Sequence, residues 1–282
     1  MPLNIFNDQP EFIQTDPRTD RPDAIAYRID PDFMYVRHEI LLPQSIFEGK
    51  TVLDLGSCNA ASGAWALSNG AKSYTGVELQ PGYVTQSKEN LAKYYSADRW
   101  NITQLSIEEF LSKPTGKFDI VIALGVAHAF ANVGGFLNAI AARSQYIAID
   151  GTHPYTIMRS PFLNGKLRAQ LMSTPDYVRF IENEPFIAMH QTGMSLRDRS
   201  TVLYDGYVPS MGFMTQILQK AGFVSTPGVN DTLKQRLPNV YSPAKKFGLS
   251  LVKNVEGQQP ALGLAQNIAT GKKMPTVKWQ NT

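Results

Sequence analysis

The chain has 282 residues, 43% hydrophobic and 18% charged, which is typical of a globular protein with a sizeable core. Its formal charge of +3 is too small to indicate nucleic-acid binding by itself. The single cysteine excludes an internal disulfide and a cysteine-only zinc site, and it fits a reducing compartment. The sequence has no apolar run of membrane-spanning length and no signal-peptide core, so we expect a soluble, cytoplasmic protein with no membrane partner.

The first part of the chain divides at residue 30. Residues 1–30 are rich in proline and aspartate and show no period, which predicts an extended N-terminal arm. Apolar residues then recur at helical spacing from Pro31, and Pro43 limits how far that helix runs. Tyr35, Arg37 and His38 lie on this helix, and we expect them to close over a bound ligand.

Strands and helices alternate in the next hundred residues. Apolar runs predict strands at Thr51–Leu55, Ser73–Glu78, Asn101–Leu105, Asp119–Leu124 and Tyr146–Asp150. Helical patterns separate them, at Ala60–Ser68, Tyr83–Tyr95, Ile107–Leu111 and Gly135–Ala142. Five apolar strands separated by helices indicate a parallel sheet covered on both faces.

The alternation stops after residue 150. Residues 151–205 show no sustained period, and because a structureless loop of that length is uncommon, we predict a substrate-covering insertion. An amphipathic helix then ends at Gly222, and Phe223–Ser225 and Phe247–Lys253 read as two more strands. The core is therefore expected at 31–150 and 206–255, and the polar residues 256–282 are expected to form a tail or an oligomer contact.

The junction between the first strand and the first following helix is the most informative part of the sequence. Small residues from Gly56 to Gly63 follow Asp54 and leave room for a ligand beside backbone N–H groups and a helix N-terminus. Cys58 stands where dinucleotide-binding loops need glycine, and no P-loop motif is present. Asp54 would repel a diphosphate but suits an amino group or a sulfonium, and Glu78 can accept hydrogen bonds from a ribose diol.

These residues resemble the class I S-adenosylmethionine (SAM)-dependent methyltransferases. Residues 52–57 look like the first motif of that superfamily, Glu78 looks like its ribose-binding acid, and residues 105–108 and 118–125 look like two later motifs. The resemblance covers roughly residues 45–150 and 207–253. It implies a Rossmann-like, seven-stranded α/β sheet with helices on both faces and an insertion after strand five.

The resemblance also implies SAM as the cofactor and a set of residues around it. The set comprises Asp54, Gly56, Ser57, Cys58, Asn59, Glu78, Leu79, Ser106, Ile107, Leu124 and Gly125. The chain departs from the superfamily pattern where Ser57-Cys58-Asn59-Ala60 stands in place of its usual second and third glycines, so the resemblance does not predict the shape of that loop.

A narrower resemblance concerns residues 124–128 and 207–210. They look similar to transferases that modify the tRNA wobble uridine with carboxy-SAM. Those enzymes carry a Tyr-His pair after the fourth strand, where this chain has Ala127-His128. The resemblance is therefore one of scaffold, and the carboxylate-binding role is not carried over.

Two histidines follow strand ends where α/β proteins place their chemistry. His128 follows strand four and His153 follows strand five, and each could act as a general base or simply pack or brace a turn. Asp150 with His153 gives only two metal ligands, so no metal is predicted. The insertion supplies five substrate-binding candidates, Tyr155, Arg159, Arg197, Arg199 and Tyr204. Such residues hold bases and phosphates or anionic small molecules, or they form a solvated surface.

The preferred interpretation is a SAM-dependent methyltransferase acting on an oxygen or nitrogen of a small-molecule acceptor, anionic or sugar-like. The chain lacks the Asn/Asp-Pro-Pro-aromatic and Pro-Cys motifs of nucleic-acid base methyltransferases. An RNA (tRNA) modifying methyltransferase is the alternative, and a non-catalytic SAM-fold binding subunit is the third hypothesis. The sequence makes no prediction of oligomeric state.

Overall fold

The computed structural model describes residues 4–13, 30–114, 116–152, 185, 187–195, 201–238, 241 and 246–254. For residues 152, 187–195, 201–208 and 246 it describes the backbone only. Among the described helices, none is both long enough and apolar enough to cross a membrane.

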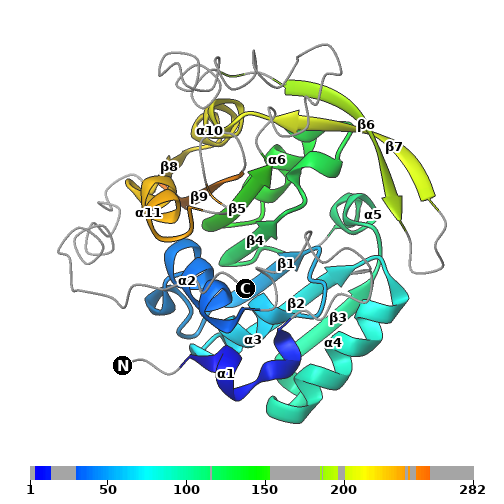
Figure 1. The fold of residues 1–282 in the computed structure, drawn as a ribbon, viewed down its shortest axis with the longest axis vertical. Coiled ribbons are helices and arrows are strands. Elements are labelled where there is room, and N and C mark those ends of the chain that lie inside the picture. The colour runs from blue at the N-terminus through cyan, green and yellow to red at the C-terminus, as the bar shows by residue number, and fades with distance from the viewer. Residues whose placement is uncertain are drawn as a thin grey trace, which may run out of the picture.

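One seven-stranded sheet organises the core (Figure 1). Its parallel strands are β1 (Thr51–Leu55), β2 (Ser73–Glu78), β3 (Trp100–Gln104), β4 (Ile120–Leu124) and β5 (Tyr146–Thr152). At one edge β9 (Lys246–Lys253) runs antiparallel to both β5 and β8 (Phe223–Ser225). The order β3-β2-β1-β4-β5-β9-β8 confirms the predicted fold class, including the two closing strands. The direction of winding reverses between β1 and β4, where α/β sheets open a crevice.

Helices cover both faces of the sheet because side chains alternate along each strand. Val52 and Ile122 pack on one side with α2 (Pro31–Leu41), α3 (Ala61–Ser68), α4 (Pro81–Tyr94) and α11 (Val229–Arg236). Leu53 and Val121 pack on the other side with α5 (Ile107–Ser112), α6 (Val133–Ala141) and α10 (Met211–Lys220). Short 3-10 turns lie at Gln44–Ile46 (η3), Ala97–Arg99 (η4) and Ala127–Ala129 (η5).

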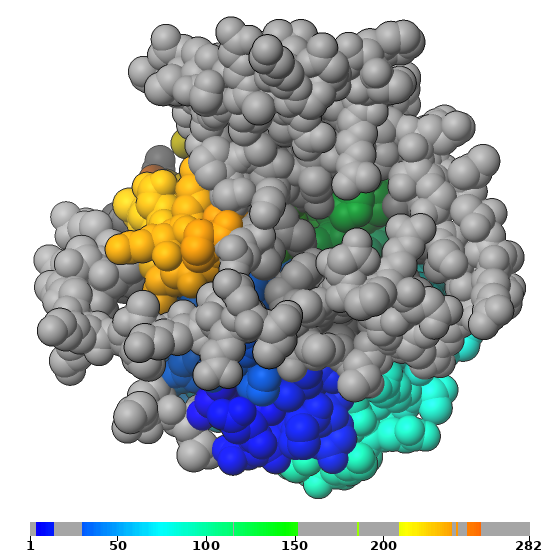
Figure 2. All heavy atoms as spheres, in the orientation of Figure 1, coloured from blue at the N-terminus to red at the C-terminus, as the bar shows by residue number. Residues whose placement is uncertain are grey.

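The N-terminal segment differs from the extended arm that the sequence predicted. Residues Ile5–Asp8 form α1 and Pro10–Phe12 form the 3-10 turn η1. Phe6 and Phe12 are fully buried, and Figure 2 shows this segment (blue) against the part of the core that contains α4 (cyan). The Asn4 side chain caps α1 by accepting from the Phe6 N–H. Elements of three or four residues are too short to show a period, which explains why sequence analysis missed them.

The insertion contains more regular backbone than its sequence indicated. β6 (Ile187–Ser195) and β7 (Thr201–Pro209) pair antiparallel as a separate two-stranded sheet. The predicted boundary at residue 205 therefore falls inside β7.

Helix α11, beyond the insertion, was not predicted from the sequence, because only Val229 and Leu233 of its eight residues are buried apolar side chains. The predicted tail, 256–282, lies outside the described residues.

Candidate active site

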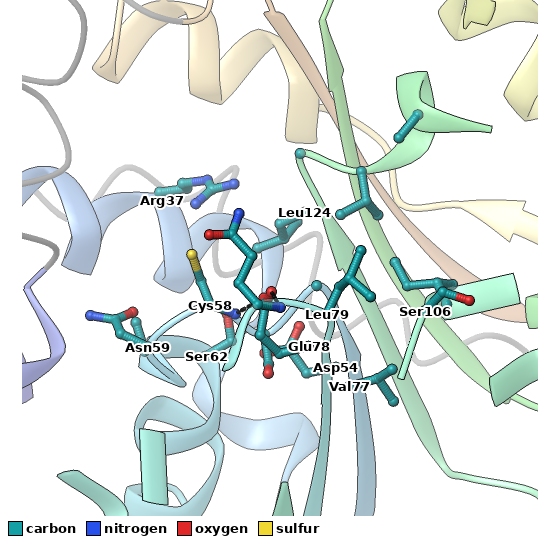
Figure 3. Close-up of a pocket in the computed structure, with 18 of the residues that line it drawn as sticks. Arg37, Asp54, Cys58, Asn59, Ser62, Val77, Glu78, Leu79, Ser106 and Leu124 are labelled. Carbon is teal, nitrogen blue, oxygen red and sulfur yellow. Dashed lines mark hydrogen bonds between the residues drawn. The ribbon is translucent and has the colours of Figure 1, made fainter. Parts of the chain in front are cut away.

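A cavity of about 430 Å³ opens at the carboxyl ends of β1, β2 and β4. All eleven residues predicted to meet the cofactor line it: Asp54, Gly56, Ser57, Cys58, Asn59, Glu78, Leu79, Ser106, Ile107, Leu124 and Gly125. Figure 3 shows side chains from the loop after β1, the end of β2 and the start of α5 arranged around one space. The structure thus brings residues from four separate chain segments to a single site.

Glu78, the last residue of β2, holds two backbone groups with its two oxygens. Its Oε2 accepts from the Cys58 N–H at 2.9 Å, and its Oε1 accepts from the Gln80 N–H at 2.8 Å. A carboxylate offers about four lone-pair positions, so further donors can be accepted from a ligand. Glu78 both fixes the loop after β1 and presents its oxygens at the cavity.

The loop after β1 keeps an alternating left-handed backbone despite its missing glycines. Gly56, Cys58 and Ala60 have φ angles of 77°, 53° and 64°. This conformation costs a non-glycine residue roughly 1–2 kcal/mol, so the surrounding structure must hold the loop in place. The Ser87 hydroxyl donates to the Cys58 carbonyl at 2.6 Å, and the Asn59 amide donates to the Phe12 carbonyl at 2.9 Å.

Asp54 is a buried acid in the cavity wall. The Tyr74 hydroxyl donates to Asp54 Oδ2 at 2.9 Å, and Asp54 is 4% exposed. Burial, with a smaller contribution from the nearby Glu78, outweighs the lowering effects of the Tyr74 hydrogen bond and Arg37, and the pKa of Asp54 is raised to about 7. Because a cationic group beside Asp54 favours its charged form, this wall suits a ligand that carries positive charge.

Helix α2 contributes Phe33, Met34, Arg37 and His38 to the cavity wall. The predicted closure by Arg37 and His38 fits this lining, whereas Tyr35 is not part of it and packs edge-on against Trp65. Burial and the neighbouring Arg37 lower the pKa of His38 to about 3, so the ring is neutral. Its Nδ1 lies 2.7 Å from the Met34 carbonyl oxygen, which assigns the proton to Nδ1. The Ser62 hydroxyl therefore donates to Nε2, at 3.1 Å.

Arg37, Asp150 and Tyr241 form a closed triangle of hydrogen bonds at this wall. Arg37 Nη2 donates to Asp150 Oδ2 at 2.7 Å, and Arg37 Nε donates to the Tyr241 hydroxyl at 2.9 Å. The Tyr241 hydroxyl in turn donates to Asp150 Oδ2 at 2.8 Å. Burial alone would lower the pKa of Arg37, but Asp150 and Tyr241 outweigh it and raise that pKa above its ordinary value. The sequence indicates a role for Asp150 only beside His153, and no pattern in it points to Tyr241.

The predicted catalytic and substrate residues are not assembled in the same way. His128 lies in η5 and is not among the residues that line the cavity, although Val126, Ala129 and Phe130 around it are. His153, Tyr155, Arg159, Arg197 and Arg199 lie outside the described residues, and only the backbone of Tyr204 is described. Within the described part of the chain, no cluster of three metal-ligating side chains occurs.

Comparisons with known proteins agree with this geometry. The family described as a methyltransferase domain matches residues 53–145. No curated protein matches the chain.

Two solved structures share the fold at low sequence identity. One is a protein from Listeria monocytogenes assigned as an S-adenosylmethionine-dependent methyltransferase, with 17% identity and a TM-score of 0.53 over 78% of this chain and 98% of that one. The other is the N-terminal domain of EvdMO1 in the presence of SAH (S-adenosylhomocysteine) and D-fucose, with 13% identity and a TM-score of 0.52 over 78% and 83% of the two chains. The matched range begins within β1 and includes β2 and β4, so it contains the carboxyl ends of the three strands at which the cavity opens. Residues 53–145 of this chain therefore match a methyltransferase domain, and the core has the fold of the SAM-dependent methyltransferases.

Proposed function

We propose that the cavity binds SAM and that the protein transfers its methyl group to an oxygen or nitrogen of a small-molecule acceptor. The single observation that carries the proposal is the convergence of all eleven predicted cofactor residues on one cavity. SAM supplies a methyl group on a positively charged sulfur, which is electrophilic without further activation. The chain's own residues then have to bind it, orient it and exclude water.

The chemistry of the lining fits SAM part by part. Glu78 has lone pairs left for the two ribose hydroxyls, and Asp54 is a buried acid suited to a positive charge. Leu79 lines the cavity and is 54% exposed, so a planar adenine ring packed on it would bury apolar surface. We assign the adenine contacts to Leu79, Ser106 and Ile107.

A small acceptor is supported by the wall that α2 builds. Phe33 and Met34 give this wall an apolar surface, and Phe130, which follows η5, adds a third apolar side chain to the cavity lining. Because His128 does not line the cavity, we assign no base to it, and His153 is the remaining candidate from the sequence. Correct orientation of the two reactants can supply much of the rate without a base. The role of the five insertion residues and the scaffold resemblance to the tRNA-modifying transferases stay predictions.

Titration calorimetry with SAM, SAH and NAD tests the cofactor assignment. We expect SAM and SAH to bind and NAD not to bind. Binding of NAD without binding of SAM would overturn the proposal.

Methyl-labelled SAM then tests the acceptor class, with small-molecule and RNA fractions of a cell extract offered separately. Label in the small-molecule fraction supports the proposal. Label in RNA supports the RNA-modifying alternative, and that activity should fall steeply with salt. Tight SAM binding with no label in either fraction favours the non-catalytic hypothesis.

A further inference from the structure

We infer that Arg37 forms an anion-binding subsite in the cavity, with Asp150 and Tyr241 as the residues that position it. The ligand group it takes is a carboxylate or a similar planar anion. This inference rests on the proposed function for its ligand, although its geometry is independent of the cofactor loop.

The first argument is the orientation of the guanidinium. Nη2 and Nε of Arg37 are both committed, to Asp150 and to Tyr241. Within the described residues, the structure records no hydrogen bond from Nη1. Figure 3 shows the Arg37 side chain reaching from α2 over the space that Cys58, Glu78 and Leu79 surround from the other side. Since a guanidinium presents its donors in a fixed plane, two anchored nitrogens also fix the direction of the third.

The second argument is the distribution of charge. Among the described residues that line the cavity, Arg37 is the only lysine or arginine, whereas Asp54, Glu78 and Glu108 are acidic. His38 is neutral beside it. Arg37 therefore supplies the positive side chain that an anionic ligand group would seek in the described lining.

The third argument is preorganisation. Asp150 is fully buried, and its Oδ2 accepts from both Arg37 and Tyr241. The side chain of Arg37 is 16% exposed, so little of its freedom is left to lose when a ligand arrives. Two segments far from α2 in the chain hold this guanidinium in a fixed position, through Asp150 and Tyr241, and selective recognition of an anion requires such a fixed position.

The anion could belong to the amino-acid part of the cofactor or to the acceptor, and ligand pairs separate these sources. SAH carries a carboxylate, and 5′-methylthioadenosine lacks the entire amino-acid end. Benzoate and benzyl alcohol provide a charged and an uncharged probe for the acceptor side of the SAH-saturated protein. Dissociation constants of the nucleosides come from calorimetry, and those of the benzyl probes from ligand-detected NMR.

The test variant is Arg37→Gln, with Arg37→Lys and Tyr241→Phe beside it. If the cofactor supplies the anion, Arg37→Gln weakens SAH by about 10- to 100-fold and leaves methylthioadenosine unchanged, as expected for loss of a charge-assisted hydrogen bond. If the acceptor supplies it, SAH is unchanged and the preference for benzoate over benzyl alcohol disappears. In both cases Arg37→Lys recovers only part of the lost binding, because an ammonium lacks the planar set of donors that a guanidinium presents. Tyr241→Phe gives a smaller loss, confined to the same ligand.

Arg236→Gln is the matched control. The side chain of Arg236, in α11, is 18% exposed and pairs at 3.1 Å with Glu39 of α2, the helix that carries Arg37, but Arg236 does not line the cavity. Arg236→Gln should leave the affinities for SAH, methylthioadenosine, benzoate and benzyl alcohol unchanged. Thermal unfolding of every variant establishes that the fold is intact.

The inference is overturned if Arg37→Gln binds all four probes as the wild type does. It is also overturned if that variant weakens SAH and methylthioadenosine equally, since this indicates a structural role for Arg37. If the wild type binds neither nucleoside, the proposed function has failed. The benzoate comparison on the ligand-free protein then still decides whether the subsite exists.

Discussion

The Glu78 carboxylate and the Cys58 backbone N–H lie 2.9 Å apart and join the end of β2 to the loop after β1. Glu78, the residue expected to hold the ribose, is therefore hydrogen-bonded to the loop expected to surround the rest of the cofactor. Binding strength and loop shape should depend on each other through this contact.

Replacing Glu78 by glutamine tests that link. The amide cannot accept from both backbone N–H groups, because one of its ends is a donor. We expect SAH affinity to fall by about 10- to 100-fold, each tenfold step being about 1.4 kcal/mol. The exposed Glu89 of α4 gives the matched control, Glu89→Gln, which should bind normally. An unchanged affinity in Glu78→Gln would remove Glu78 from the cofactor site.

The left-handed backbone at Cys58 makes a prediction about stability. Cys58→Gly should be tolerated without loss, because glycine adopts a φ of 53° freely. Cys58→Val should lower the free energy of unfolding by about 1–2 kcal/mol, since a β-branched residue is strained there. Urea unfolding measures both, with Cys58→Ser as the control for loss of the sulfur. Equal stability of the valine and serine variants would contradict the left-handed conformation.

Asp54 predicts proton release on binding. Its pKa is raised from 3.8 to about 7 in the folded protein, so below neutral pH the folded form holds a proton there. The ammonium group of bound SAH should ionise Asp54, so SAH binding at pH 6 should release a proton and tighten as the pH rises toward 7. Calorimetry in two buffers of different ionisation enthalpy counts the protons. Asp54→Asn should release none, and proton release that persists in this variant assigns it to another group.

The same shift has a consequence for the ligand-free protein. Because the folded pKa of Asp54 lies above the unfolded value, its stabilising contribution is present below about pH 4 and is lost as the pH rises through about 7. Relative to wild type, Asp54→Asn should therefore gain stability as the pH rises across that interval.

His38 should act in the opposite direction. Its pKa is lowered from 6.5 to about 3, so its contribution is present above pH 6.5 and is lost as the pH falls toward 3. His38→Leu cannot titrate, and its free energy of unfolding should fall less than that of the wild type between pH 7 and pH 4.5. Urea unfolding at three pH values measures the difference. Parallel pH profiles for the two proteins would show that the imidazole is not buried in neutral form.

The sequence predicted the part of the site that is built from local pattern. β1 and β2 have the predicted bounds, and Asp54 and Glu78 follow from the spacing of one β-α unit. The loop was uncertain because Cys58 and Ala60 replace glycines. The structure shows that hydrogen bonds from Ser87 and Asn59 hold the left-handed backbone instead.

The rest of the site could not be read from local pattern, because its contacts join distant positions. Arg37 meets Asp150 across 113 residues and Tyr241 across 204 residues. No periodicity or motif connects a helix before the sheet, the end of β5 and a single tyrosine after α11. Only the assembled fold places these three side chains together.

Asn59 provides the last test, because it connects the N-terminal segment to the cofactor loop. It is 1% exposed, and its amide donates to the Phe12 carbonyl at 2.9 Å. Asn59→Ala leaves that buried carbonyl unpaired, so we expect a loss of about 1–3 kcal/mol in the free energy of unfolding. SAH affinity should also fall, because Cys58 and Ala60 depend on the same support to keep their left-handed backbone. Asn69→Ala is the control, since Asn69 donates to the Trp65 carbonyl at 2.8 Å but lies outside the cavity lining. If both variants lose stability and both keep full SAH affinity, the N-terminal segment stabilises the fold without shaping the cofactor loop.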